Sequence, residues 1–376
     1  MKGGKPVTVL NAITWTLGGS TLFLAGGFLL ALTLPVDSWR TGEPAVMPLT
    51  LTPGPTSLDR PTRVWIDTDA ACGVGTTKDP DDCFGLLLLA QSSDVNIVGV
   101  STIFGNAPLA VTDPTTRALL SQLRTDGMPA ATVYLGSAKP LADGASEPQS
   151  PAHEMLRQAL QEGPLVIVAL GPLTNVASAL RGHPDLQARV QQLVAVMGRR
   201  RGHVFHPVEG SSAHSVLGHG PIFSDLNLAQ DPKAAAEVLA MGLPLTLVPY
   251  DAARAVMIDQ AILDGMSARG GAWLWVADRS RAWLAHWRRD INRPGFYPFD
   301  LLAAAYLLQP SMLACADVSV AVGDDTGVLG WLGYPGLFVV TAKEPALRPA
   351  AIGRARYCPE VDQQLGPWLA GQLTAR

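Results

Sequence analysis

The sequence is poor in cysteine and has little net charge, and each shortage narrows the possible functions. The four cysteines, Cys72, Cys83, Cys315 and Cys358, form no CxxC pair and have no Cys/His spacing typical of zinc ligands. The chain carries 28 basic and 32 acidic side chains without a basic stripe, which argues against nucleic acid as a partner. The cysteines leave open a disulfide between two of them if the domain is exported.

The chain is long enough for a large folded domain. It has 376 residues, 48% of them apolar, which is sufficient for one large α/β domain or two smaller ones. No internal repeat and no clear boundary occur within residues 63–376. We therefore predict a single domain over residues 63–376.

The first 36 residues differ from the rest. Residues 6–36 carry no charge, and residues 13–34 are mostly apolar. As a helix this run would measure about 33 Å, enough to cross a hydrocarbon core of roughly 30 Å. Lys2 and Lys5 precede it, which predicts a cytoplasmic N-terminus and a single-pass anchor in the cytoplasmic membrane, with the rest of the chain on the extracytoplasmic side. The alternative is a cleaved signal peptide and a secreted protein.

A proline-rich segment follows the apolar run. Prolines occur at positions 44, 48, 53, 55 and 61, and no helical period is visible. We predict that residues 37–62 are an extended linker.

Within residues 63–376, apolar runs typical of strands alternate with helical patterns. Strands are predicted at 63–67, 96–103, 132–135, 165–170, 193–197, 245–249, 318–322 and 337–341. Helices are predicted at 82–91, 114–123, 151–161, 174–180, 232–241, 259–266, 272–289 and 299–308. The continuous apolar run Leu165–Leu170 is typical of a strand covered on both faces. The alternation predicts an α/β fold with a mostly parallel, doubly wound sheet.

Acidic residues gather where the first of these strands ends. Asp67 and Asp69 follow the run 64–66, and Asp81 and Asp82 begin the next helix, with Asp79 just before them. Helix capping explains one of these acids but not the group, and so many like charges would repel without a cation. Because the ligands offered are oxygens, without His or Cys, the pattern favours Ca²⁺ or Mg²⁺.

Three further turns bring polar residues to the same predicted edge of the sheet. Thr174 follows the strand 165–170, Asp225 and Asn227 precede a helix that starts at Pro232, and Asp300 opens the helix 299–308. In open α/β folds this edge holds the binding site. A structural interpretation is also open for each: Thr174 and Asp300 as helix caps, and Asp225 and Asn227 as polar loop residues.

These motifs occur in one order that resembles a known family. They are Asp67-Thr-Asp69 … Asp81-Asp82, Phe104-Gly-Asn106, Leu170-Gly-Pro-Leu-Thr-Asn175, Asp225-Leu-Asn227 … Asp231-Pro232 and Phe299-Asp300-Leu-Leu-Ala. Over residues 63–310 the chain resembles the inosine-uridine preferring nucleoside hydrolases. The resemblance implies a Rossmann-like α/β domain that holds one Ca²⁺ and cleaves the N-glycosidic bond of a ribonucleoside into ribose and free base.

The resemblance also implies a role for each motif residue. Calcium ligands would be Asp69, Asp82, Asp300 and the backbone carbonyl of Thr174, with Asp67 supporting them. Ribose hydroxyls would contact Asp81, Asn106, Asp225 and Asn227. Asp69 would in addition orient or deprotonate the attacking water.

The sequence departs from the family pattern in two ways that affect the leaving base and the pocket. Eleven residues, 70–80, separate Asp69 from Asp81, where the family has a shorter loop. Phe299 stands where many members have a histidine that protonates the leaving base. A histidine-rich loop follows Arg199-Arg-Arg201 and contains His203, His206, His214 and His219. One of these histidines could protonate the leaving base in place of the missing one. Alternatively, the loop could be a flanking segment with incidental histidines.

Further alternatives concern the tryptophans and the reaction itself. Trp283 and Trp287 share a helix face and either pack in the core or stack on a nucleobase. A protein of this fold could also bind a nucleoside without cleaving it. A phosphatase of the haloacid dehalogenase type is suggested by Asp67-Thr-Asp69, but it leaves the Thr174 and Asn227 motifs unexplained. The family resemblance also implies a possible homo-oligomer.

Overall fold

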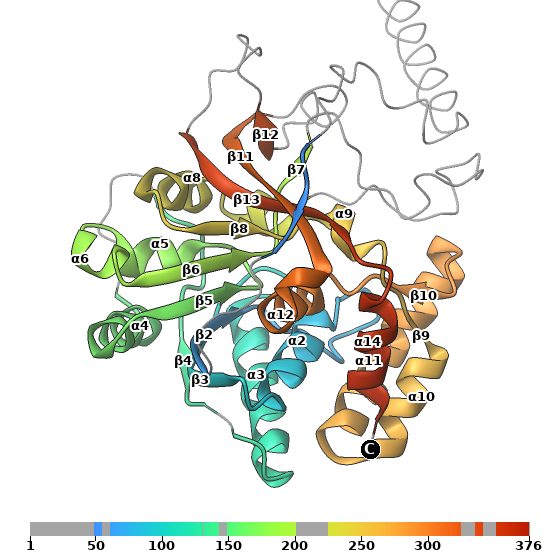
Figure 1. The fold of residues 1–376 in the computed structure, drawn as a ribbon. Coiled ribbons are helices and arrows are strands. Elements are labelled where there is room, and N and C mark those ends of the chain that lie inside the picture. Colours follow the sequence, from blue (N-terminus) through green and yellow to red (C-terminus); the bar gives the residue numbers. More distant parts are fainter. Residues whose placement is uncertain are drawn as a thin grey trace, which may run out of the picture.

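The computed structural model describes residues 49–54, 61–129, 131–142, 149–200, 225–324, 335–340 and 351–375. In this part of the chain, eleven strands form one sheet in the order β4-β3-β2-β5-β6-β8-β13-β11-β12-β7, with β1 paired to β11 (Figure 1). The strands are β1 Thr52–Pro53, β2 Thr62–Thr68, β3 Val95–Thr102, β4 Val133–Leu135, β5 Leu165–Ala169, β6 Val190–Ala195, β7 Arg199–Arg200, β8 Leu245–Leu247, β11 Leu313–Asp324, β12 Pro335–Val340 and β13 Ala351–Val361. A separate pair joins β9 Ile258–Asp259 to β10 Gly295–Phe296.

The half of the sheet from β4 to β8 is parallel. Strand β2 lies between β3 and β5 and pairs with both in parallel. The chain runs from β2 outward through β3 to β4, then returns to β5 and continues through β6 to β8 on the other side. The direction of winding therefore reverses between β2 and β5, and such a reversal opens a crevice at the carboxyl ends of the two strands.

Helices cover both faces of the parallel half. Val64 and Ile66 point into one apolar core, while Trp65 between them points into the other. The first core contains α2 Asp81–Ala90, α3 Leu109–Thr125 and α12 Phe299–Leu308; the second contains α4 Pro151–Glu162, α5 Thr174–Leu180 and α8 Pro232–Met241. The prediction of an α/β fold with a mostly parallel sheet is confirmed.

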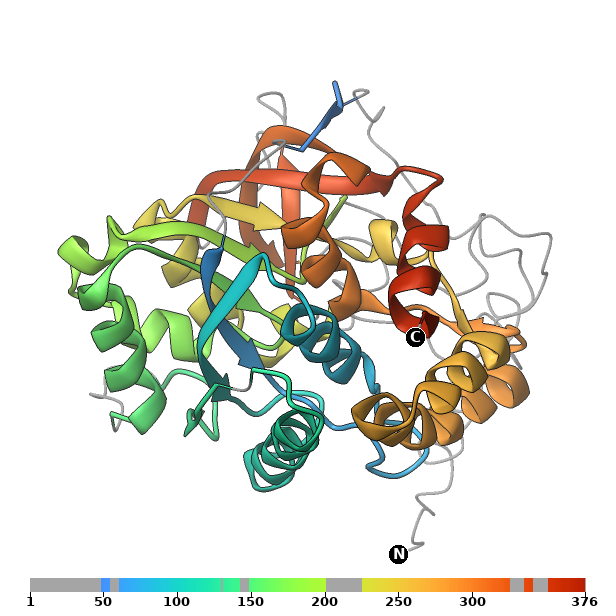
Figure 2. The ribbon, with the colours of Figure 1, turned by 60° about the horizontal axis from the view of Figure 1, so that its bottom comes forward.

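Two other parts of the chain extend this frame. Strand β11 pairs antiparallel with β12 and β13, and the Cys315–Cys358 disulfide joins β11 to β13. Helix α10 Gln260–Arg269 packs against α11 Gly271–His286 and α14 Leu365–Thr374, beside the sheet (Figure 2). The sequence patterns predicted α10 and α11 but neither β13 nor α14. Short elements complete the fold: α6 Pro184–Gln187, α7 Leu226–Gln230, α9 Tyr250–Ala253, a π-helical turn Trp287–Ile291 and a 3-10 turn Pro310–Met312.

Part of the predicted linker lies on the sheet. Thr52 and Pro53 pair antiparallel with Cys315 and Ala314 of β11, and the Gly54 amide donates to the Leu313 carbonyl at 3.1 Å. The folded unit therefore includes residues that precede 63.

The predicted location in the membrane is contradicted. Across the described ranges, the structure contains no helix with both the length and the apolar character needed to cross a bilayer. The run 13–34, on which the prediction of a single-pass anchor rested, lies outside the described residues.

Candidate active site

A cavity of about 310 Å³ opens at the carboxyl ends of the parallel strands. Its wall includes Asp69 after β2, Asn106 after β3, Leu170 after β5, Met197 after β6 and Tyr250 after β8. Each of these residues leaves its strand at the same edge of the sheet, so the topology alone brings together segments from distant parts of the sequence.

Three carboxylates form the centre of one wall. Asp81, Asp82 and Asp300 are buried, and one oxygen from each lies within 4.8 Å of the others. The Asp300 amide donates to Asp81 Oδ2 at 2.8 Å, while Asp82 Oδ1 accepts from the Thr68 hydroxyl at 2.5 Å. Helices α2 and α12 both begin here, so the positive ends of two helix dipoles point at the cluster.

The electrostatics of this cluster favour a bound cation. Burial, together with the neighbouring charge of Asp81, raises the pKa of Asp82 to about 6. Burial, followed by repulsion from Asp81 and Asp82, raises the pKa of Asp300 well above its ordinary value. A bound divalent cation would offset both the burial of these carboxylates and their mutual repulsion. An all-oxygen donor set suits a hard ion such as Ca²⁺ or Mg²⁺. The residues present therefore fit the metal that the family implies.

Asp69 faces the same cavity and is held from two sides. Its Oδ2 accepts from the Asn106 amide at 2.6 Å. A Cβ at Gly105 would collide with this carboxylate, and one at Gly171 would lie 3.1 Å from its Cγ. Glycine at both positions therefore leaves the room that the Asp69 side chain occupies.

The sequence interpretation missed the position of Asp79. It gave this residue no role, but Asp79 lines the cavity, and its carbonyl accepts from Asn106 Nδ2 at 2.7 Å. Its Oδ1 accepts from the Asp81 amide at 3.2 Å. No sequence period marks such a residue, because its place depends on the path of residues 70–80.

Asp67 lies behind the cavity and does not line it. It is fully buried, and its Oδ1 accepts from Ser101 Oγ at 2.5 Å and from Asn175 Nδ2 at 2.7 Å. Burial raises the pKa of Asp67 to about 7. Asn175 in turn accepts from the Ser137 amide at 2.8 Å and contacts His153 Nε2 at 3.2 Å. This buried network ties β2 to the neighbouring elements beneath the site.

Thr174 is buried at the start of α5, and its side chain does not cap that helix. Its hydroxyl donates instead to Asp231 Oδ2 at 2.7 Å, and Asp231 caps α8 by accepting from the Ala234 amide. The side chain therefore links α5 to α8, and Thr174 is not among the residues that line the cavity.

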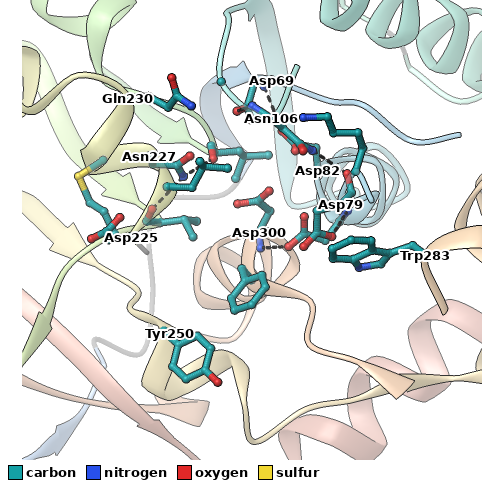
Figure 3. Close-up of a pocket in the computed structure, with 18 of the residues that line it drawn as sticks. Asp69, Asp79, Asp82, Asn106, Asp225, Asn227, Gln230, Tyr250, Trp283 and Asp300 are labelled. Carbon is teal, nitrogen blue, oxygen red and sulfur yellow. Dashed lines mark hydrogen bonds between the residues drawn. The ribbon is translucent and has the colours of Figure 1, made fainter. Parts of the chain in front are cut away.

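Asp225 and Asn227 lie across the cavity from Asp82 and Trp283 (Figure 3). Asp225 caps α7 and accepts from the Gly198 amide at 2.7 Å. Asn227 Nδ2 donates to the carbonyls of Leu170 and Val196, at 2.6 and 2.9 Å. The side-chain nitrogen of Asn227 thus bonds to the residues that follow β5 and β6, and these bonds fix the side chain at the cavity wall.

Aromatic side chains form a second, less polar part of the wall. Phe299 stacks on Tyr250 with ring centroids 5.7 Å apart, and Trp283 lines the cavity from α11. Trp287 lies 6.1 Å from Trp283 between ring centroids but is fully buried in the core. Of the two alternatives for the tryptophans, core packing therefore applies to Trp287, while Trp283 contacts both core and cavity. The sequence interpretation did not single out Tyr250.

The predicted histidine-rich loop lies outside the described residues, as do His203, His206, His214 and His219. Arg199, just before it, is 3% exposed and begins β7. Burial raises the pKa of Asp225, and hydrogen bonds from the Gly198 and Leu228 amides and then the Arg199 guanidinium partly offset this rise. Among the described residues that line the cavity there is no histidine.

Comparison with known proteins agrees with this geometry. Residues 64–345 match the model of the inosine-uridine preferring nucleoside hydrolase family. An uncharacterised protein of Schizosaccharomyces pombe is 27% identical over 281 residues, covering 66% of this chain and 83% of that protein. The pyrimidine-specific ribonucleoside hydrolase RihA of Salmonella schwarzengrund is 25% identical over 269 residues, covering 64% of this chain and 80% of the relative.

Among solved structures, a plant nucleoside hydrolase, PpNRh1, superposes with a TM-score of 0.65. The superposition covers 84% of this chain and 100% of the plant chain at 21% identity, which supports the fold. The family match extends over most of the chain and includes every strand that contributes to the cavity wall. The chain therefore belongs to the inosine-uridine preferring nucleoside hydrolase family.

Proposed function

We propose that the protein hydrolyses the N-glycosidic bond of a ribonucleoside at the cavity described above, with Ca²⁺ as its metal. The predicted reaction class, nucleoside N-ribohydrolysis, is confirmed by family membership. The single observation that carries the assignment to this cavity is the buried cluster of Asp81, Asp82 and Asp300, whose repulsion a hard cation relieves.

Four groups would hold the metal in this proposal. They are the carboxylates of Asp69, Asp82 and Asp300 and the backbone carbonyl of Thr174, supported by Asp67 from behind. A bound Ca²⁺ would neutralise the carboxylates and lower the pKa of a water molecule beside Asp69. Asp67 supports this arrangement through Asn175, because the same hydrogen-bond network fixes the end of β2.

The residues around the cluster divide the cavity by chemistry. Asp81 and Asn106 on one side, and Asp225 and Asn227 on the other, offer carboxylate and amide oxygens to ribose hydroxyls. The aromatic part of the wall, formed by Trp283, Phe299 and Tyr250, suits the flat face of a nucleobase. A ribonucleoside has this same division between a polar sugar and an aromatic ring.

Asp69 is the proposed base. Its Oδ2 is fixed by the Asn106 amide, so the carboxylate keeps one orientation while it takes the proton of the attacking water. The water oxygen bonds to C1′ of the sugar as the C1′–N bond breaks, and the bonding pair passes to the base nitrogen. Carboxylates beside the sugar stabilise the positive charge that develops on its ring.

We also propose the chain organisation that accompanies this function. Residues 63–376 form the catalytic domain, and the proline-rich residues 37–62 precede it. Thr52 and Pro53, which belong to this proline-rich segment, pair with β11 of the domain.

A substrate panel tests the proposal. The full chain is incubated with purine and pyrimidine ribonucleosides, with Ca²⁺ or with a chelator, and released ribose is measured by a reducing-sugar assay. We expect ribose release that the chelator abolishes and added Ca²⁺ restores. Tight nucleoside binding without ribose release from any member of the panel would instead identify a binding module.

A further inference from the structure

The Cys72–Cys83 disulfide encloses the segment that supplies the acidic wall of the cavity. Cys72 follows Asp69 by three positions, and Cys83 follows Asp82 directly in the first turn of α2. Both cysteines are buried, with 3% and 0% of their surface exposed. The bond therefore closes a ring whose members include Asp81 and Asp82, immediately beside Asp69.

The residues inside this ring form one continuous part of the cavity wall. They are Thr77, Lys78, Asp79, Asp81 and Asp82. The Asp79 carbonyl fixes Asn106 from this segment, and Asn106 in turn fixes Asp69 through its backbone amide. A displacement of the ring would therefore move the acids inside it and the carboxylate outside it together.

Few non-covalent contacts hold the middle of the ring. Gly73 and Gly75 adopt positive φ angles of 82° and 65°, and residues 75–77 are exposed. Gly73 packs closely on the Arg279 side chain of α11, where an added Cβ would lie 2.6 Å from Cγ. Between this contact and the start of α2, only residues 75–77 are exposed, whereas Pro80 is buried just before the helix. The carboxylates within the segment repel one another and Asp300. A covalent bond at both ends of the segment opposes its displacement.

We propose that Cys72 and Cys83 are positioning residues for the metal site: their disulfide holds Asp81 and Asp82 where the metal and the sugar bind. This inference rests on the proposed function for the identity of the ligands. Reduction by a dithiol breaks the S–S bond with two electrons and two protons, forming two thiols and oxidising the dithiol to its own disulfide. The reduced protein keeps its fold and binds the metal less tightly.

The chain provides a matched control. Cys315–Cys358 also joins buried cysteines, but it links β11 to β13 and neither residue lines the cavity. Two full-length variants are compared, Cys72→Ala/Cys83→Ala and Cys315→Ala/Cys358→Ala. The Ca²⁺ dissociation constant is measured by calorimetry, kcat and KM are measured at saturating Ca²⁺, and folding is checked by near-UV circular dichroism.

We expect the Cys72→Ala/Cys83→Ala variant to bind Ca²⁺ roughly 10- to 100-fold more weakly, the usual effect of losing the support of a metal ligand. Saturating Ca²⁺ should restore most of its kcat, whereas a merely structural loss would not respond to the metal. The Cys315→Ala/Cys358→Ala variant should keep the wild-type dissociation constant within about twofold. Equal dissociation constants in the two variants would overturn the proposal.

Reduction supplies a second test that does not depend on the alanine variant folding. In the Cys315→Ala/Cys358→Ala protein, dithiothreitol can reduce only Cys72–Cys83, and thiol titration confirms when it has done so. Reduction should weaken Ca²⁺ binding there, and an unchanged dissociation constant after complete reduction would contradict the proposal. Calorimetry measures Ca²⁺ binding independently of turnover. Absence of nucleoside cleavage would therefore count against the proposed function, while the measured effect of the disulfide on Ca²⁺ binding would stand.

Discussion

The backbone amide of Asp300 donates a hydrogen bond to Asp81 Oδ2 at 2.8 Å, across a separation of 219 residues. This bond joins the first turn of α12 to the first turn of α2. The two helices also pack along their apolar lengths. The acidic cluster is therefore a consequence of helix packing: once α2 and α12 pack in this register, their N-terminal carboxylates meet.

Replacing Asp300 with alanine should separate metal binding from folding. Without metal, the variant loses a source of repulsion and should unfold at or above the wild-type temperature. Ca²⁺ at 100 times the dissociation constant should stabilise the wild type by about 2.7 kcal/mol, and it should stabilise the variant much less. Differential scanning calorimetry with and without Ca²⁺ measures both effects. Asp264→Ala on the exposed side of α10 is the control; a variant that keeps the full Ca²⁺ response would exclude Asp300 as a ligand.

Asn175→Ala should destabilise the protein. The change removes the donor to Asp67 and the acceptor for the Ser137 amide, both buried. Asp67 Oδ1 keeps its bond from Ser101 Oγ, but the Ser137 amide loses the Asn175 oxygen, so urea unfolding should show a loss of roughly 1–3 kcal/mol. Asn96→Ala on the exposed side of β3 should change stability by less than about 0.5 kcal/mol. Equal effects of the two substitutions would show that the network adds nothing to stability.

The protein should lose stability as the pH falls from 6.5 to 4, between the ordinary pKa of histidine and the pKa of His153. Burial lowers the pKa of His153 to about 4, from an ordinary value of 6.5. Between these values the unfolded chain binds a proton that the folded protein does not, so this contribution is complete above pH 6.5 and is lost as the pH falls to 4. The expected loss is about 3 kcal/mol.

Urea titrations at several pH values measure this contribution. His153→Gln should reduce the slope of stability against pH in this window, whereas His183→Gln, in the turn before α6, should not. The same slope in wild type and His153→Gln would assign the acid sensitivity to other groups.

Trp283→Ala should weaken substrate binding more than it changes the chemical step. Stacking of a nucleobase on an aromatic side chain contributes about 1–3 kcal/mol, so KM should rise roughly 5- to 150-fold. Trp287→Phe, in the core one helical turn further on, should lower stability and leave KM unchanged. Steady-state kinetics with a purine and a pyrimidine nucleoside give both constants. If KM is unaffected in Trp283→Ala, the aromatic wall is not the base site.

The parallel half of the sheet and the acidic group could be predicted because both are local in sequence. The core of β5, Leu165–Ala169, is a continuous apolar run, and Asp67 and Asp69 follow β2 directly. The residues that the sequence interpretation missed depend on long-range geometry. Asp79 reaches the cavity through the path of residues 70–80, and Tyr250 does so through the chain after β8.

Further differences between the prediction and the structure also depend on tertiary packing. The Thr174 hydroxyl could cap its own helix or bond to a distant acid, and only the packing of α5 on α8 decides for Asp231. Strand β13 has an irregular pattern of exposed and buried residues, and it pairs with β8 only at Arg356 and Tyr357. The pairing of Cys72 with Cys83 likewise follows from the fold of the segment between them.

The most direct test of the account is single-turnover hydrolysis of a cleaved ribonucleoside by wild type and by Asp69→Asn, both saturated with Ca²⁺. The amide keeps the size of the side chain and still accepts from the Asn106 amide, but it cannot take a proton from water. We predict that the variant folds and binds the nucleoside, and that its rate of ribose release falls by about 10²- to 10⁴-fold. A variant that releases ribose at the wild-type rate would contradict the assignment of this carboxylate, and with it the proposed mechanism.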